Sequence, residues 1–320
     1  MSDSVLGLHH ITAIAGDAQR NYDFYTSVLG LRLLKKTVNF DDPKTYHLYF
    51  GDEIGSPGTI LTFFPWGSDM VTGRRGSHMA TEIGYAVPED SFGFWLNRFQ
   101  ERHVTYNKPA EKFGEPYLTF LDPDGLKLEL IATKSRGSSK PWETAEVNAG
   151  VATRGFHHIS LSLAAIRETA ELLTEVFGYK LVDQQVNRYR FKTDAVGHAA
   201  IIDLVEVPYE MRGHVAAGTV HHVAFRVKNE QVLMQYREKI VRRGLNITEQ
   251  IDRTYFYSLY FREPGGVLFE LATENPGFAV DEPLEKLGTG LKLPPKYEHQ
   301  RDNIEAALPT LTSLWQSHPG

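Results

Sequence analysis

The chain has 320 residues, of which 42% are hydrophobic and 12% aromatic, so it is long enough to bury two substantial cores. Its net charge is −6, and it has no basic stripe of the kind that binds nucleic acid. No run approaches the roughly 18 apolar residues of a membrane helix, and the N-terminus does not resemble a signal sequence. We therefore expect a soluble cytoplasmic protein. The absence of cysteine excludes disulfides, thiolate nucleophiles and cysteine-based zinc sites, which leaves His, Asp and Glu as metal ligands, a set suited to Fe(II), Mn(II) or Zn(II).

The beginning of the chain predicts a strand, a helix and two further strands. Residues 9–14 (HHITAI) alternate with the period of two that is typical of a strand. Asp17 is an N-cap residue type that precedes apolar residues at helical spacing, so we expect a helix that runs to Leu29 and ends at the glycine after it. Residues 45–50 and 59–64 are extended stretches separated by the turn sequence GSPG.

Two more strands and a connector follow. Residues 81–87 (TEIGYAV) predict a strand, and residues 122–130 (DPDGLKLEL) predict a turn that leads into another. The stretch 134–150 contains RGSSKP and has little periodicity, so we expect it to connect two modules.

The C-terminal half repeats this order. Residues 157–162 (HHISLS) and 221–226 (HHVAFR) predict strands, and Asn229 predicts the start of a helix that ends near Gly244. The apolar residues at helical spacing in that helix are Val232, Leu233, Tyr236, Ile240 and Val241. The last part of the chain stands outside the pattern, predicts one short helix near 303–308, and is expected to pack over one module.

The spacing of shared motifs indicates a tandem duplication. His10 and His158 are 148 residues apart, and so are Gly30 and Gly178, which follow similar apolar helix ends. The endings DPDGLKLEL and EPGGVLFEL recur at an offset of 141. One structural unit has therefore been copied.

Each half divides again into two similar units. Glu82 precedes Glu129 by 47 residues, and His222 precedes Glu270 by 48, so the strands that carry them take equivalent places. The predicted fold is therefore α+β, with four units in paired modules. The predicted divisions are an N-terminal module at 5–133, a linker at 134–152, a C-terminal module at 153–274 and a tail at 275–320.

Histidine pairs begin three of the strands and hold six of the 13 histidines. Imidazoles at the same point of several copies suggest that the copies converge on a metal. Glu270 lies in the apolar strand VLFEL, where an unpaired carboxylate would cost several kcal/mol, so it should have a cationic or metal partner. His222 begins a strand of the same unit, and two equivalent residues, His10 and His158, are candidates for the second imidazole.

The pattern resembles the vicinal oxygen chelate superfamily, in which paired βαβββ units curl into a cup that holds a metal. The strand-initial histidines, the helix ending VLGL and the DPDG…LEL ending carry the resemblance over nearly the whole chain. The motifs GLHHIT (7–12), YHLYFGD (46–52) and PGGVLFE (264–270), and the tail motif PGF (276–278), are similar more narrowly to those of hydroquinone ring-cleaving dioxygenases.

The resemblance implies which residues bind the metal. In relatives that cleave catechols the third and fourth units supply the site, which would select His158, whereas in the hydroquinone group the first and fourth units do. We therefore predict a ligand triad of His10, His222 and Glu270. Two histidines and one carboxylate leave three adjacent positions for substrate and oxygen, the arrangement of non-haem Fe(II) oxygenases.

Further site residues follow from the same resemblance. Thr12 shares a strand face with His10, Tyr260 would hydrogen-bond the bound phenolate or reduced oxygen, and Arg253 would offset negative charge. The alternative to these site roles is that Tyr260 is an ordinary aromatic residue packed in a strand and that Arg253 lies on the surface. The N-terminal half has Lys112 and Thr119 at the equivalent positions.

The remaining histidines and acids have less direct roles. His9 and His221 belong to the site as neighbours of the ligands, and we expect their side chains to point to the opposite strand face and to support or pack rather than bind metal. Glu82 and Glu129 could form a second acid-rich site with His47, but an ordinary salt-bridged pair in a degenerate cup is the preferred interpretation. For His158 the alternative to ligation is a buried, neutral, hydrogen-bonded residue.

The function implied by the resemblance is Fe(II)-dependent cleavage of a hydroquinone ring with O2, with Mn(II) or Zn(II) as substitutes in a crystal. Three alternatives stay open: a catechol-cleaving extradiol dioxygenase, a glyoxalase-like isomerase or lyase with Zn(II) or Ni(II) and a fourth protein ligand, and a metal-free protein that binds small molecules. The partners are a small aromatic substrate and O2, in a monomer or a homo-oligomer.

Overall fold

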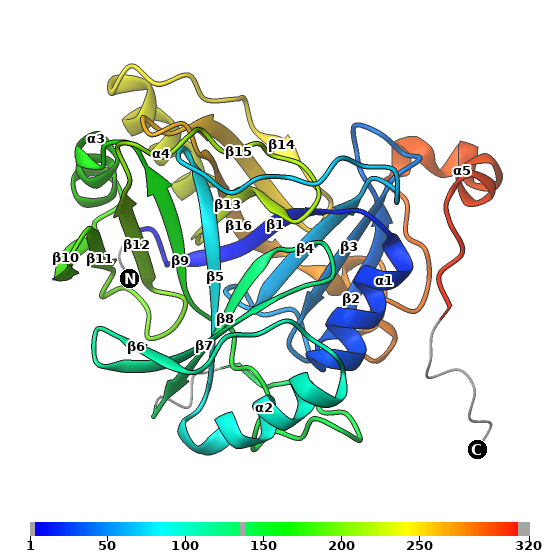
Figure 1. The fold of residues 1–320 in the computed structure, drawn as a ribbon. Helices are drawn as coiled ribbons and strands as arrows, with labels where there is room; N and C mark the ends of the chain where they lie inside the picture. The colour runs from blue at the N-terminus through cyan, green and yellow to red at the C-terminus, as the bar shows by residue number, and fades with distance from the viewer. Residues whose placement is uncertain (1–3, 135–138, 313–320) are drawn as a thin grey trace.

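The structure is a computed structural model that describes residues 4–134 and 139–312. Residues 1–3, residues 135–138 of the predicted linker and residues 313–320 of the predicted tail lie outside the described part. Two eight-stranded mixed sheets dominate the fold, with few helices (Figure 1). This is the α+β architecture expected of paired βαβββ units.

The first sheet joins the first unit to the fourth, in the order β14-β15-β16-β13-β1-β4-β3-β2. Its strands are β1 (Leu8–Ala15), β2 (Arg32–Val38), β3 (Tyr46–Gly51), β4 (Ile60–Pro65), β13 (Thr219–Val227), β14 (Ile251–Asp252), β15 (Phe256–Arg262) and β16 (Leu268–Pro276). The antiparallel pair β1–β13 is the seam between the two units.

The second sheet joins the second unit to the third, in the order β10-β11-β12-β9-β5-β8-β7-β6. Its strands are β5 (Met79–Pro88), β6 (Ala110–Lys112), β7 (Glu115–Leu121), β8 (Lys127–Thr133), β9 (Phe156–Leu163), β10 (Lys180–Gln185), β11 (Arg188–Lys192) and β12 (Ile201–Glu206). Each sheet therefore contains strands from both halves of the sequence.

The helices begin where the sequence predicts. Asp17 caps α1 (Ala18–Asp23) by accepting a hydrogen bond from the Arg20 amide, and the helix continues as a wider turn through Val28. Asn229 caps α4 (Glu230–Arg242) in the same way. Val241 is the exception among the predicted core residues of α4, because it is 49% exposed. The other helices are α2 (Phe92–Glu101), α3 (Arg167–Glu171) and α5 (Arg301–Ala307), and no helix among the described residues is long and apolar enough to cross a membrane.

One hydrophobic core lies between the seams of the two sheets. Ile11 of β1 faces Val223 of β13, Ile83 of β5 faces Ile159 of β9, and all four side chains are fully buried in the same cluster. Because side chains alternate along a strand, the neighbours of these residues point to the other face of each sheet. Those two concave faces are called here the first cup, around His10, and the second cup, around His158.

The described part of the tail, residues 275–312, packs over the first unit. Leu291 forms a bridge beside Lys36 of β2, and α5 lies in the same region (Figure 1). The fully buried ammonium of Lys35 is 2.6 Å from carboxylate oxygens of both Asp281 and Glu282. A buried lysine with two acidic partners fixes the tail to β2 and so to the wall of the first cup.

Candidate metal centre

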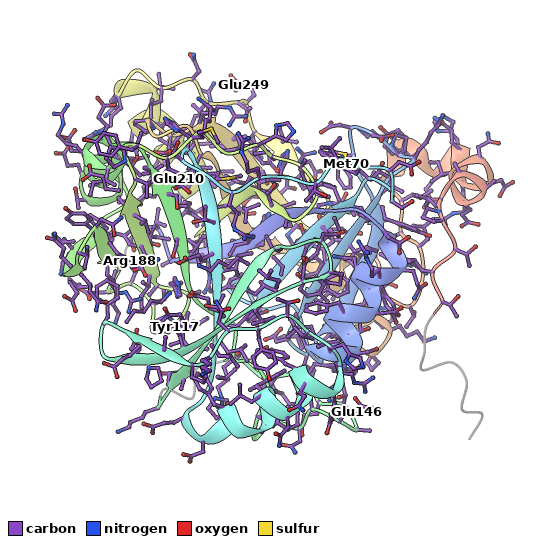
Figure 2. The ribbon with its side chains drawn as sticks, in the orientation of Figure 1. Met70, Tyr117, Glu146, Arg188, Glu210 and Glu249 are labelled. Atoms are coloured by element: carbon purple, nitrogen blue, oxygen red, sulfur yellow. The ribbon has the colours of Figure 1, made fainter. Side chains whose placement is uncertain are left out.

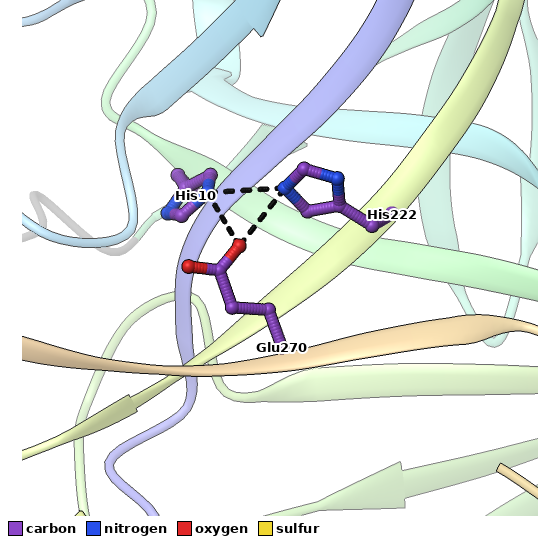
Figure 3. Close-up of side chains that lie close together, drawn as sticks. All are labelled: His10, His222 and Glu270. Atoms are coloured by element: carbon purple, nitrogen blue, oxygen red, sulfur yellow. Dashed lines mark hydrogen bonds and ion pairs between the residues drawn. The ribbon is translucent and has the colours of Figure 1, made fainter. Parts of the chain in front are cut away.

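Three side chains from adjacent strands converge in the first cup. Nε2 of His10 (β1) is 3.1 Å and Nε2 of His222 (β13) is 2.9 Å from the same oxygen, Oε2 of Glu270 (β16) (Figure 3). The two imidazole nitrogens are 3.4 Å apart. All three side chains are buried, and their donor atoms form a group that could hold a metal ion.

The strand pairing explains this convergence. His10 lies opposite Ala224 in β13, and Ala224 lies opposite Glu270 in β16, so His10 and Glu270 are both neighbours of one residue. His222 precedes Ala224 by two and therefore shares its strand face. Residues that are more than 200 positions apart in the sequence thus meet on one face of the sheet.

His9 and His221 contact the outer nitrogens of the candidate ligands. Their Nδ1 atoms are 2.9 Å from Nδ1 of His10 and 2.8 Å from Nδ1 of His222, respectively. The prediction that they face the opposite side is wrong, because the β1–β13 register shifts at both positions and leaves one extra residue in each strand. Such a bulge turns consecutive side chains toward the same side.

These contacts can direct the imidazole lone pairs of His10 and His222 toward Glu270. Burial lowers the pKa of His9 well below its usual value and that of His221 to about 3, so both rings are neutral at pH 7. A hydrogen bond donated from Nδ1 of His10 or His222 leaves the lone pair on Nε2, which faces Glu270. Neighbours that orient a ligand in this way are usual around protein-bound metals.

The donor set fits a divalent cation. Oε2 of Glu270 is buried without a hydrogen bond, although two imidazole nitrogens lie close to it. Burial acts to raise the pKa of Glu270, but His10 and His222 hold it well below its usual range, and burial lowers the pKa of His222. Three adjacent ligands at about 2.1 Å from one ion lie about 3 Å apart, which matches the observed separations.

Glu270 also has a hydrogen-bond partner, Ser258, that no motif in the sequence singles out. The Ser258 hydroxyl, on the neighbouring strand β15, donates a hydrogen bond to Oε1 of Glu270. This bond orients the carboxylate so that Oε2 faces the imidazoles. Cross-strand partners of this kind have no signal in the local sequence, because they depend on strand register.

A cavity of about 290 Å³ opens in front of the three side chains. Most of its wall is aromatic or apolar, and the remainder is polar. Its lining residues are His10, Asn39, Phe40, Asp41, His47, Tyr49, Phe64, Trp66, His221, His222, Thr248, Arg253, Phe256, Tyr260 and Leu268. A small planar ring fits such a cavity.

Arg253 and Tyr260 form one side of this cavity. Nε of Arg253 donates to the Tyr260 hydroxyl at 3.2 Å, and the guanidinium lies over the tyrosine ring, 5.2 Å from its centre. Burial raises the pKa of Tyr260, so the phenol stays protonated, and burial acts to lower the pKa of Arg253 but Tyr260 and Glu270 raise it. Arg253 thus lines the cavity instead of lying on the open surface.

Thr12 lies behind the cavity wall in a chain of hydrogen bonds. Its hydroxyl is 2.7 Å from that of Thr62, which is 2.9 Å from Nε2 of His47, and Nδ1 of His47 is 2.9 Å from the Tyr49 hydroxyl. The idea that His47 joins Glu82 and Glu129 is wrong, because β3 belongs to the first sheet. The strand YHLYF therefore supplies two wall residues that the sequence analysis did not assign to this site.

His158 lies in the second cup, away from the three candidate ligands. It meets Glu82 and Glu129 there, and its Nε2 is 3.3 Å from Oε2 of Glu129. Burial, assisted by the Lys112 ammonium, lowers the pKa of His158 well below its usual value. The buried, neutral interpretation of this histidine agrees with these contacts.

Comparisons with known proteins place the chain among relatives that match almost its whole length. A model of the Glyoxalase/Bleomycin resistance protein/Dioxygenase superfamily matches residues 7–130 and 155–271. A Bacillus subtilis protein with the provisional name ring-cleaving dioxygenase MhqO is 44% identical, covering 96% of this chain and 97% of the relative. The chlorohydroquinone/hydroquinone 1,2-dioxygenase of Sphingobium indicum is 37% identical, covering 95% and 96%.

Solved structures agree with this placement. The crystal structure of a provisionally named dioxygenase from Bacillus subtilis matches with a TM-score of 0.93 and 42% identity, covering 97% of this chain and 99% of that one. Glyoxalase I from Zea mays matches with a TM-score of 0.62 at 16% identity, covering 84% and 92%, a likeness of fold alone.

Proposed function

Because the chain belongs to the Glyoxalase/Bleomycin resistance protein/Dioxygenase superfamily, we propose that it is an Fe(II)-dependent dioxygenase that cleaves the ring of hydroquinones with O2. Two relatives of nearly full-length coverage carry names of ring-cleaving dioxygenases, and one of them is named for hydroquinone and chlorohydroquinone. In the proposed reaction the ring bond beside a hydroxyl-bearing carbon breaks and both atoms of O2 enter the product.

The observation that carries the proposal is the position of the three donors at the base of an aromatic cavity. His10, His222 and Glu270 would hold the metal, and a ferrous ion would supply open positions for a phenolic oxygen and O2 together with redox capacity. The group of candidate ligands has three members among the described residues. This count favours an oxygenase over the isomerase alternative, which would use a fourth protein ligand.

The other residues have roles set by where they lie. Phe64 and Trp66 are stacked, with ring centres 6.3 Å apart and planes inclined by 8°, and they form an apolar wall that holds the substrate ring and excludes water. Tyr260, protonated and already accepting from Arg253, would donate its own hydrogen to a phenolate oxygen. Arg253 offsets negative charge that develops on the substrate.

Oxygen consumption with defined metals tests the proposal. Protein stripped of metal is reloaded anaerobically with Fe(II), Mn(II) or Zn(II), and O2 uptake is measured with methylhydroquinone, chlorohydroquinone and catechol. We expect one O2 consumed per hydroquinone with Fe(II), two ¹⁸O atoms in the product, and a lower rate with catechol. Turnover without O2, or full activity with Zn(II), would refute the dioxygenase function and favour the isomerase.

A further inference from the structure

The second cup repeats the geometry of the first. His158 of β9 lies opposite Gly84 of β5, and Gly84 lies opposite Glu129 of β8, which is the register that relates His10, Ala224 and Glu270. Glu82 precedes Gly84 by two, as His222 precedes Ala224. The donor atoms of Glu82, Glu129 and His158 lie within 4.8 Å of one another, and all three side chains are buried.

An ammonium group lies among these donors. Nζ of Lys112 forms a hydrogen bond with Oε2 of Glu129 and is 3.3 Å from Nε2 of His158 and 3.8 Å from Oε2 of Glu82. Lys112 is 7% exposed, so its charge is compensated by these neighbours and not by solvent. One cation of the protein itself therefore contacts all three of the groups that correspond to the candidate metal ligands.

In the first cup, no lysine or arginine among the described residues forms an ion pair with Glu270. Arg253 lies at the position equivalent to Lys112, at the offset of 141 that relates the two unit endings. Its Nε donates to the Tyr260 hydroxyl, whereas the second cup has Thr119 in place of that tyrosine. The Arg253 side chain is thus held by the phenol and kept away from Glu270, whereas Lys112 has no such phenol and reaches Glu129.

Further charged side chains lie in the second cup. Arg190 lies opposite Asp203 in the register in which Tyr49 lies opposite Thr62 in the first cup. Arg188 contacts Glu82 at 2.9 Å, and Lys127 contacts it at 2.6 Å.

These ion pairs leave no excess negative charge for a dication. Arg188 and Tyr117, whose ring the Lys112 ammonium overlies, belong to this side of the molecule (Figure 2). Burial acts to raise the pKa of Glu82, but its cationic neighbours hold it at about 2. The buried charges are therefore paired within the protein.

We propose that the second cup is a duplicated metal site in which the ammonium of Lys112 takes the place of the ion. The chain then holds one metal, in the first cup, and gains a second when Lys112 is replaced by a short neutral residue. The number of ions in the native chain rests on the proposed metal centre of the first cup, whereas the gain of a site on removal of Lys112 does not.

The experiment counts bound ions in matched variants. Metal-free protein is dialysed against micromolar Mn(II) or Co(II), and bound metal is measured by mass spectrometry, with the Co(II) absorption spectrum as a second readout. We expect one ion in the wild type and two in Lys112→Ala. Lys127→Ala removes a lysine from the same cup without removing the central cation and should keep one ion, as should Lys112→Met, which fills the space without charge.

A variant that has lost a candidate ligand of the first cup tests the inference on Lys112 separately from the proposed metal centre. His222→Ala should bind no ion, and adding Lys112→Ala to it should restore one. If the wild type binds none but Lys112→Ala binds one, the proposed centre of the first cup fails and the inference on Lys112 stands. Two ions in the wild type, or no gain in Lys112→Ala, would overturn the inference.

Loss of Lys112 removes the lysine partner of the buried Glu129 carboxylate, so the variant can unfold without metal. Its circular dichroism and melting temperature are therefore measured with and without Co(II). Recovery of the folded state with one additional ion supports the inference, and a chain that stays unfolded at saturating Co(II) contradicts it.

Discussion

Replacement of Tyr260 by phenylalanine separates chemistry from packing in the proposed site. The hydroxyl accepts from Arg253 at 3.2 Å, and the ring meets His222 edge-on with centres 5.6 Å apart. Phenylalanine keeps the ring, and with it the stacking of the Arg253 guanidinium at 5.2 Å. Tyr260→Phe therefore removes one donor and leaves the cavity wall in place.

The expected loss of rate depends on whether the Tyr260 hydroxyl binds the substrate in the ground state or only in the transition state. If it donates to the phenolate only as charge develops, its loss costs on the order of 10² in rate, or about 2.7 kcal/mol. Both kcat and kcat/KM should fall by this factor, because an interaction made only in the transition state affects them equally. The fold should lose little, about 0.5–1.5 kcal/mol for one hydrogen bond, since Arg253 keeps its contact with Asp41 at 3.9 Å.

The assay follows O2 uptake with methylhydroquinone and measures iron content and melting temperature on the same preparations. Tyr257→Phe is the matched control, because Tyr257 lies in the same strand β15 but outside the cavity lining. We expect a loss of about 10² in Tyr260→Phe with full iron content and no loss in Tyr257→Phe. Unchanged kinetics in Tyr260→Phe would reduce the residue to a packed strand aromatic and refute the reasoning.

Three further outcomes are expected. His10→Ala should lose bound iron whereas His158→Ala keeps it, measured by metal analysis, and the reverse pattern would transfer the site to the third unit. Lys35→Met should lower the free energy of unfolding in urea by about 3–5 kcal/mol, because it leaves the carboxylates of Asp281 and Glu282 in the tail without their lysine partner. A change below 1 kcal/mol would show that other contacts hold the tail. Burial lowers the pKa of His9, His47 and His158 below 6.5, so only the unfolded chain takes up these protons. The free energy of unfolding of the metal-free protein should therefore be constant with respect to these histidines above pH 6.5, and should fall by about 1.4 kcal/mol per histidine for each pH unit below it. Equal urea midpoints at pH 7.5 and 5.5 would contradict this prediction.

The repeat arithmetic predicts a large part of this fold. Offsets of 148 and 141 residues correspond to equivalent strands in the two sheets, and the caps Asp17 and Asn229 begin helices where expected. These features are predictable because each depends on local chemistry, either side-chain alternation or a single capping oxygen. Pairing between units is different, because nothing in the strand of His10 states that β13 will lie beside it.

The bulges show why alternation fails near the site. A regular strand places His9 and His10 on opposite faces, as it does His221 and His222. The structure inserts one extra residue at each pair, so the outer histidine reaches the ring of its neighbour. A bulge depends on the partner strand as much as on its own residues, and the sequence HHIT has no feature that predicts it.

The choice between His10 and His158 has the same physical basis. Both begin a strand with a His-His pair, both lie two strands away from a glutamate, and both are buried, so local sequence reasoning does not distinguish them. Their cups differ in which group compensates that glutamate. Lys112 reaches Glu129, whereas Arg253 is held by Tyr260 and leaves Oε2 of Glu270 without a hydrogen bond. The informative residue for a metal site in a duplicated fold is therefore the nearest cation, since a site that the protein has already neutralised gains little from an ion.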